Sequence, residues 1–265
     1  VVRVAPGATP ASAPVTSSGT YIGDSSASFT LTTLGDGADM NSFTATEGTN
    51  NTLANGSENN LRFEITNPNV NKGTFNLLTR DNLRWEVVSP NTASGTFNLL
   101  IRRGDDTSRR KVILEQFNNL TLDPNSPNYI ARAIGDQVQQ VRDGGGLDPF
   151  LQLSGSFQNR SKFVRVTVLQ QTYNYLDNNG NVRLGSLSGS LPLAQSGSFS
   201  GASDGTSKTA PIAFYENISN TNSQGIAVGA TAGKNAYIDA IRLLKNQDEY
   251  DINLITLPGL IDNFT

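Results

Sequence analysis

The 265-residue sequence contains no histidine and no cysteine, and these two absences exclude several kinds of site. Without histidine, the chain cannot carry a Ser-His-Asp or Cys-His catalytic arrangement or a histidine-ligated metal. Without cysteine, it has no disulfide, zinc ribbon, iron–sulfur cluster or thiol nucleophile. An enzyme built on this chain would have to rely on Asp and Glu pairs, as glycosidases do, and no pair is placed persuasively.

Charged residues are also scarce, at 16% of the chain against about 25% in typical globular proteins. Asn, Ser, Thr and Gln fill the difference, so charge repulsion does not favour disorder and the chain is long enough to bury a core. A net charge of −3 argues against general nucleic-acid binding, which needs a basic surface. No apolar run approaches the length of a membrane span.

The apolar runs at the two ends, 1–4 and 252–257, are typical of buried strands. The second run follows a predicted helix, and a single strand after a helix does not complete a parallel α/β sheet. We therefore expect the chain to be an internal piece of a longer protein.

The first 60 residues predict loops and short strands. Residues 5–20 are rich in Pro, Ala, Ser and Gly and predict a loop or linker. Strands are expected at 21–34 and 41–46, on either side of a turn at 35–37, and 49–60 reads as a polar loop.

A 22-residue repeat follows. Residues 60–80 align with residues 82–102 with 13 identities over 21 positions. In each unit an alternating apolar run leads to a Pro-Asn turn and a second apolar run, which predicts a duplicated β-hairpin. Two units are too few for a solenoid, which needs at least about three repeats.

Beyond the repeat, residues 97–102 and 111–117 predict another hairpin. A helix is expected at about 127–134, with Ser126 as its N-cap, Pro127 at its first position and Gly135 just after its end. A strand at 162–168 and a hairpin tip at 177–181 come next.

A second helix is expected at about 235–244, and its apolar residues share one face. They are Tyr237, Ile238, Ile241 and Leu244.

Several short motifs are better explained by structure than by chemistry. Gly201-x-Ser203-x-Gly205 matches a hydrolase nucleophile motif but lacks a histidine partner. Gly233-Lys234 is more typical of a helix N-terminus than of a phosphate loop. Residues 177–181 resemble the start of a calcium loop, but Ser188 occupies the position of its glutamate. The acidic residues Asp248, Glu249 and Asp251 read as a solvated connection. We expect no catalytic, cofactor-binding or metal-binding residue.

The densest run of charge lies in the predicted hairpin after the repeat, and its residues are candidates for contacts between subunits. They are Arg102, Arg103, Asp105, Asp106, Arg109, Arg110 and Lys111. The run includes the tripeptide Arg103-Gly104-Asp105, which spells an integrin-type motif, although a tight turn requires Gly-Asp for backbone reasons alone.

Residues 95–106 and 115–130 resemble the contractile-tail sheath proteins of bacteriophages. The most specific part is the block Phe-x-Asn-Leu-Thr-Leu-Asp-Pro-x-Ser-Pro-x-Tyr-Ile, which begins at Phe117 and leads to Ile134-Gly135-Asp136. The resemblance covers most of the chain but is sharp only over about 95–136. The hairpin duplication is not expected in every member, and the terminal arms that link neighbours in this family have no counterpart in the sequence.

The resemblance implies an α+β, mainly β fold in which a protruding, β-rich region with a hairpin meander is attached to a partly included α/β core. Residues 1–9 would end a core strand, 10–60 form a variable outer region, and 235–265 begin the core. Residues 61–234 would form a β-rich middle domain that carries the short helix near 127–134.

The resemblance also implies a mechanical function rather than an enzymatic one. Sheath subunits polymerise helically around a tail tube and contract to drive the tube through the host envelope for genome ejection. The implied partners are other sheath subunits, the tail tube protein, and the baseplate and tail terminator proteins, with no nucleic acid and no membrane insertion. The implied location is the tail of the virion, assembled in the bacterial cytoplasm. The alternative is a β-rich adhesin or receptor-binding virion protein, which would suit the uncharged polar loops and the Arg-Gly-Asp tip.

Overall fold

The computed structural model describes residues 8–19, 26–37, 40–41, 43–46, 74–77, 82–107, 109–142, 149–204, 231–246 and 250–256. Among these residues 45% lie in strands and 13% in helices, so the fold is mainly β, as the sequence predicts. The chain forms two compact units. Unit 1 comprises residues 1–9, 138–154 and 203–265, and unit 2 comprises 10–137 and 155–202. The division at residues 60–61 and 234–235 stays a prediction.

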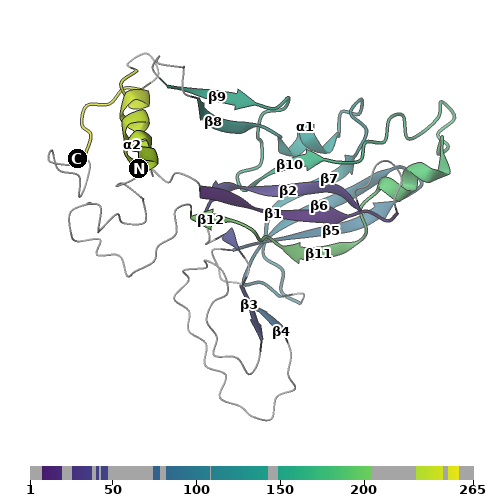
Figure 1. Cartoon of the computed structure of the whole chain (residues 1–265). Coiled ribbons are helices and arrows are strands. Elements are labelled where there is room, and N and C mark those ends of the chain that lie inside the picture. Colours follow the sequence, from purple (N-terminus) through teal and green to yellow (C-terminus); the bar gives the residue numbers. More distant parts are fainter. Residues whose placement is uncertain are drawn as a thin grey trace, which may run out of the picture. The chain divides into compact units, whose positions relative to one another are not determined.

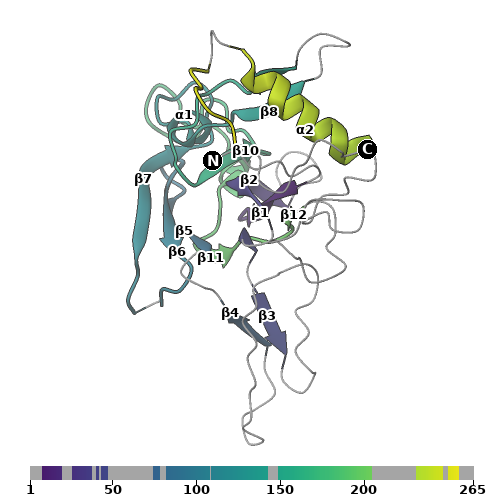
Figure 2. The same cartoon turned by 90° about the vertical axis from the view of Figure 1, so that its left-hand side faces the viewer.

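Unit 2 is built on two antiparallel sheets (Figure 1). The first sheet has β2 (Ala27–Asp36) between β1 (Ala8–Thr16) and β10 (Val164–Val168). The second sheet has the order β11 (Gln195–Ser198), β5 (Leu83–Asn91), β6 (Thr96–Arg103) and β7 (Ile113–Thr121). Figure 2 shows β7 at the edge of this second sheet.

The core lies between the two sheets because alternate residues of each strand point inward. On β5, Leu83, Trp85 and Val87 are buried, whereas the residues between them are half-buried. The rings of Phe29 on β2 and Phe97 on β6 stack across the sheets, with centroids 5.7 Å apart. Each fully buried side chain of this kind stabilises the fold by about 1.5–3 kcal/mol relative to exposure.

The predicted loop at 5–20 is wrong, because residues 8–16 form strand β1. Its small residues Ala11 and Ala13 are buried in the core, so a composition typical of linkers fills inner-face positions of a sheet. Pro10 and Pro14 are tolerated because β1 has a continuous neighbour only on the β2 side. On its other side β1 bonds through Ser12 with Ser200 and pairs with β12 (Ser203–Asp204) through Ala8 and Thr9.

Most of the predicted hairpins are confirmed. β5 and β6 form the second hairpin of the repeat, β6 and β7 form the next, and a turn at Asp177–Asn181 is closed by a bridge between Leu176 and Val182. The first repeat unit lies outside the described residues except for β4 (Thr74–Leu77), which pairs with β3 (Phe43–Thr46). The polar loop at 49–60 and the strand at 1–4 also fall outside the described residues.

The first helix, α1 (Ile130–Ile134), is shorter than predicted, and its N-cap is Tyr129 rather than Ser126. Ser126 instead belongs to the preceding turn, where its hydroxyl accepts the backbone N–H of Asn128. The predicted end at Gly135 is confirmed. Gly135 has φ +110°, and a Cβ there would lie 2.2 Å from the Cα of Asn159, so only glycine fits.

Other loop and strand predictions are refined. The strand expected at 162–168 is β10 (Val164–Val168), and the 3₁₀ helix η2 (Gly185–Ser190) lies further along the chain. The strand expected at 21–34 is β2, which begins at Ala27 within the described part and continues through Gly35 to Asp36.

Unit 1 contains the hairpin of β8 (Val138–Arg142) and β9 (Phe150–Ser154) and the helix α2 (Thr231–Leu244). The second helix is therefore confirmed, with a start four residues earlier than predicted. The strand predicted at 252–257 is wrong over its described part, because residues 250–256 form no regular secondary structure. Every hydrophobic core residue of the described part lies in unit 2.

Candidate functional site in the β6–β7 loop

The seven charged residues singled out from the sequence lie at the end of β6 and in the loop that leads to β7. Arg102 stands on the outer face of β6, because its neighbours Ile101 and Arg103 occupy inward positions of the alternating strand. The loop then turns at Gly104 and returns to β7 at Ile113. The structure separates these residues into a buried group and an exposed group.

Arg102 and Asp106 form a buried ion pair. The guanidinium of Arg102 donates from Nε to Oδ2 of Asp106 at 2.7 Å and from Nη2 to Oδ1 at 2.8 Å. The Arg102 side chain is 4% exposed and that of Asp106 is fully buried. This two-pronged geometry is the strongest arrangement available to an arginine and a carboxylate.

Two residues of the neighbouring strand, Arg84 and Glu86, complete the site, and the sequence did not point to them. Glu86 accepts from Arg102 Nη1 at 2.9 Å and from Lys111 Nζ at 2.7 Å. Arg84 approaches Asp106 at 3.7 Å. The sequence feature that could have revealed them is the position of Arg84 and Glu86 on the polar face of an alternating strand. This feature identifies the site only when the β5–β6 register is known, because the register places that face beside Arg102. We call Glu86, Arg102, Asp106 and Lys111 the ion-pair network.

Backbone hydrogen bonds fix the path of the loop around this network. The N–H of Val112 donates to Oδ2 of Asp106 at 3.0 Å, and the N–H of Gly104 donates to the carbonyl of Asn82 at 2.8 Å. At the tip, Thr107 and Arg110 exchange backbone hydrogen bonds of 3.2 and 3.1 Å. The buried carboxylate of Asp106 therefore joins both sides of the loop and holds the tip in place.

The tip itself presents positive charge to solvent. Arg109 and Arg110 are exposed, and neither guanidinium makes an ion pair within the described part of the chain. Lys111 is partly exposed but bound to Glu86. Of the seven predicted contact residues, Arg102 and Asp106 are buried and paired with each other within the chain. A contact with another molecule would therefore have to use the remaining five.

The Arg103-Gly104-Asp105 tripeptide has its two charged side chains paired with each other. Nε of Arg103 donates to Oδ1 of Asp105, and both side chains are about one-third exposed, at 32% and 35%. A receptor that reads an arginine and an aspartate separately would have to break this pair first.

The turn that resembles a calcium loop is organised by its own backbone. Oδ1 of Asp177 accepts the N–H groups of Asn179 and Asn181, each at 2.8 Å. These bonds, the one from Asn181 first, hold the pKa of Asp177 below its usual value. In the described part of the chain no group of three or more acidic residues is placed to hold a metal ion.

The structure describes the other candidate motifs only in part. Ser203 lies in strand β12 and Gly233 and Lys234 lie in the first turn of α2, as expected of a helix N-terminus, while Gly205 lies outside the described residues. Asp251 is exposed, and Asp248 and Glu249 lie outside the described residues. No helix among the described residues is long and apolar enough to cross a membrane.

Comparison of the chain with protein-family models, with curated proteins and with solved structures gave no match.

Proposed function

We propose that this chain is a structural subunit of a contractile phage tail sheath, which polymerises helically around the tail tube and contracts to drive it through the host envelope. The observation that carries the proposal is the resemblance of residues 95–136 to that family. Partners would be other sheath subunits, the tail tube protein, and the baseplate and tail terminator proteins. The subunit would reside in the virion and have no catalytic role.

The position of the resembling residues supports a role in forming the subunit. Leu120, Leu122, Tyr129 and Ile130, all from the block that begins at Phe117, belong to the core of unit 2. Asp123 stabilises the same region, because its carboxylate accepts the N–H groups of Asn125 and Asn174. A block with these contacts builds a scaffold and leaves function to the surfaces around it.

The exposed apolar residues of unit 1 support an assembling protein. Seven of the fourteen exposed large hydrophobic residues of the described part lie in unit 1, although unit 1 contributes none of the core. They include Val141 and Leu153 of the β8–β9 hairpin and Leu254, which is 83% exposed. Apolar surface left open in this way is typical of contacts with other polypeptides.

The β6–β7 loop supplies a charged surface for contacts with other subunits. Its tip holds two arginines that make no ion pair with any described residue, on a chain of net charge −3, so an acidic surface of a neighbouring subunit would complement it. Repetition of such a contact between unlike surfaces builds an open helix when it does not close into a ring. Movement of rigid subunits between two packings would then provide contraction.

Negative-stain electron microscopy tests the proposal. The whole parent protein that contains this chain is imaged beside the chain itself, alone and with tail tube. We expect tubes from the parent protein and dispersed particles from the chain. The variant Arg109→Glu/Arg110→Glu should shorten or abolish the tubes. The matched control Arg160→Glu/Arg183→Glu, which reverses two exposed charges elsewhere on unit 2, should still form them.

A parent protein that stays a compact oligomer even when tail tube is supplied would overturn the proposal. In that case the adhesin is the better candidate, and the Arg103-Gly104-Asp105 tripeptide, whose two charged side chains are about one-third exposed, is the feature that favours it. Cell binding that is lost in Asp105→Ala and retained in Arg160→Glu would establish that alternative.

A further inference from the structure

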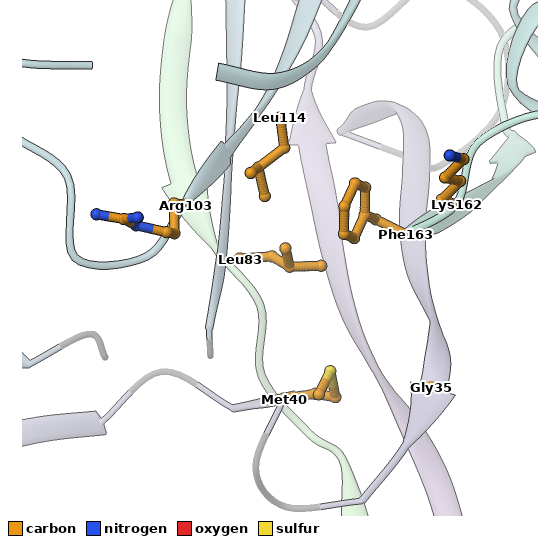
Figure 3. Close-up of a pocket in the computed structure, with 7 residues that line it drawn as sticks. All are labelled: Gly35, Met40, Leu83, Arg103, Leu114, Lys162 and Phe163. Carbon is orange, nitrogen blue, oxygen red and sulfur yellow. The ribbon is translucent and has the colours of Figure 1, made fainter. Parts of the chain in front are cut away.

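A pocket of about 530 Å³ opens at one end of the unit 2 sandwich, and its lining includes Arg103 and Leu114, which flank the β6–β7 loop (Figure 3). Its apolar lining is formed by Met40, Leu83, Leu114 and Phe163. Figure 3 shows the side chains of Leu83, Leu114 and Phe163 pointing toward a common space. A volume of this size lies within the range of about 300–1,000 Å³ that is typical of ligand sites.

Two local features of the strands create the pocket. On β7, a bulge places Glu115 opposite Ile101 and Ile113 opposite Arg102, so Leu114 is the extra residue between them. A bulge re-aims a side chain, and here it brings Leu114 to the side of the sheet where Leu83 lies. On β2, Gly35 has no side chain, and a Cβ there would meet only the Met40 sulfur, at 3.8 Å. Space therefore remains between the inner faces of the strands at this end.

Among the described residues, the charged side chains that line the pocket are both basic, Arg103 and Lys162. The guanidinium of Arg103 is paired with Asp105 and points away from Leu114 in Figure 3. The ammonium group of Lys162 makes no ion pair in the described part of the chain, while its backbone N–H donates to Glu115 at 2.8 Å. Of the two cations among the described lining residues, Lys162 is therefore the one that makes no ion pair with another described residue.

We propose that this pocket binds an acidic, extended segment of a partner protein, which inserts one large apolar side chain between Leu83, Leu114 and Phe163. A carboxylate next to that side chain would pair with Lys162. The apolar lining supplies binding free energy through burial, and the cations select the charge of the flanking residues. The proposal goes beyond a sheath function and stands whether or not the chain forms tubes.

Binding is tested by titrating the ¹⁵N-labelled chain with the synthetic peptide Ac-EDLFDE-NH₂ and following amide shifts by NMR. Two control peptides replace the charges (Ac-KKLFKK-NH₂) or the apolar pair (Ac-EDAADE-NH₂). We expect shifts that cluster at Leu83, Leu114 and Phe163, and dissociation constants more than about tenfold weaker for each control peptide.

Variants locate the site on the protein. Gly35→Leu fills the pocket without changing charge, and Lys162→Glu reverses the charge at that position, so both should weaken binding of the acidic peptide. Lys162→Glu should also improve binding of the basic peptide. Leu184→Ala and Arg183→Glu, which change exposed residues outside the pocket, should bind as the parent chain does.

The proposal is overturned if no peptide binds up to about 1 mM, an affinity of only about −4 kcal/mol. It is equally overturned if the three peptides bind alike, or if the shifts map away from the pocket. These outcomes say nothing about tube formation, so the failure of this proposal and of the sheath proposal can be told apart.

Discussion

Arg102 concentrates several interactions in one buried side chain. It binds the carboxylates of Asp106 and Glu86, and through them it connects β5, β6 and the loop. Such pairs contribute little compared with a well-packed apolar group, but the loss of one partner leaves a buried charge without compensation. Arg102 therefore contributes both to the stability of the fold and to the conformation of the β6–β7 loop.

Substitution Arg102→Ala should lower the free energy of unfolding by about 3–5 kcal/mol, because Asp106 would stay buried without its two hydrogen bonds to Arg102 and would keep only Arg84, at 3.7 Å, as a charged partner. Arg103→Ala is the control, since its partly exposed pair with Asp105 is worth less than about 1 kcal/mol. Denaturant unfolding followed by the fluorescence of Trp85, the single tryptophan, measures both. In the double variant Arg102→Ala/Asp106→Ala the loss should be smaller than the sum of the single losses. Equal effects at Arg102 and Arg103 would contradict the role of burial.

Asp177 offers a pH dependence whose sign follows from its contacts. The backbone N–H groups of Asn181 and Asn179 stabilise its charged form, so the folded-state pKa lies below the unfolded one. Its contribution to stability is therefore fully present above the unfolded pKa and is lost as the pH falls through the lowered folded pKa. NMR titration of the Asp177 carboxyl carbon should give a lower midpoint in the folded chain than in a peptide of residues 174–184. A midpoint equal to that of the peptide would contradict the hydrogen-bonded turn.

The candidate site could be predicted from the sequence only in part. Arg102, Asp106 and Lys111 lie within ten residues of one another in the sequence, which was sufficient to predict a charged loop. The sequence did not reveal that Asp106 is buried against Arg102, or that Glu86 joins the network, because both depend on the tertiary structure around the strands. Register is set by tertiary packing, and a shift of one residue would carry Glu86 to the opposite face.

At the scale of elements, strands with strong alternation were predicted well, whereas weakly patterned ones were not, β1 and the strand expected at 252–257 among them. β5 and β6 alternate large apolar and polar residues, and their hairpin is present as expected. β1 escaped prediction because Ala and Ser carry little pattern, although Ala11 and Ala13 are buried. The strand at 252–257 was expected from its apolar residues alone, yet Ile252 and Leu254 are exposed and no neighbouring strand pairs with the described residues 250–256.

The β8–β9 hairpin should be less stable than the packed sheets of unit 2. Its ten residues pair with each other over the full length of both strands, but none of them is buried. A two-stranded hairpin without a packed face is marginal in water. Amide hydrogen exchange should therefore be at least about 100-fold faster in β8 and β9 than in the central strand β6. Exchange in the hairpin as slow as that at Leu99 and Leu100 would indicate that another polypeptide or another part of the chain covers it.

At the scale of the whole molecule, unit 2 is assembled from two separate stretches of chain. Residues 10–137 supply β2 and β5, and residues 155–202 supply β10 and β11, which pair with them. The second stretch also places Val164, Val166, Leu191 and Phe199 in the common core. The covalent link between the stretches runs through the β8–β9 hairpin, which contributes nothing to that core.

A cut in this link should therefore leave unit 2 intact. In a chain whose residues 143–148 are replaced by the recognition site of a specific protease, cleavage yields fragments 1–142 and 149–265 in the numbering of the parent. We expect the fragments to elute together in gel filtration with unchanged Trp85 emission, and to separate only in denaturant. As a control, the same protease site is placed between Ser188 and Gly189 of η2. Cleavage there should be slower, because the buried side chains of Leu187 and Leu191 hold the segment in place. If the first cut released the fragments under native conditions, the pairing of β10 with β2 and of β11 with β5 would not be what holds the molecule together.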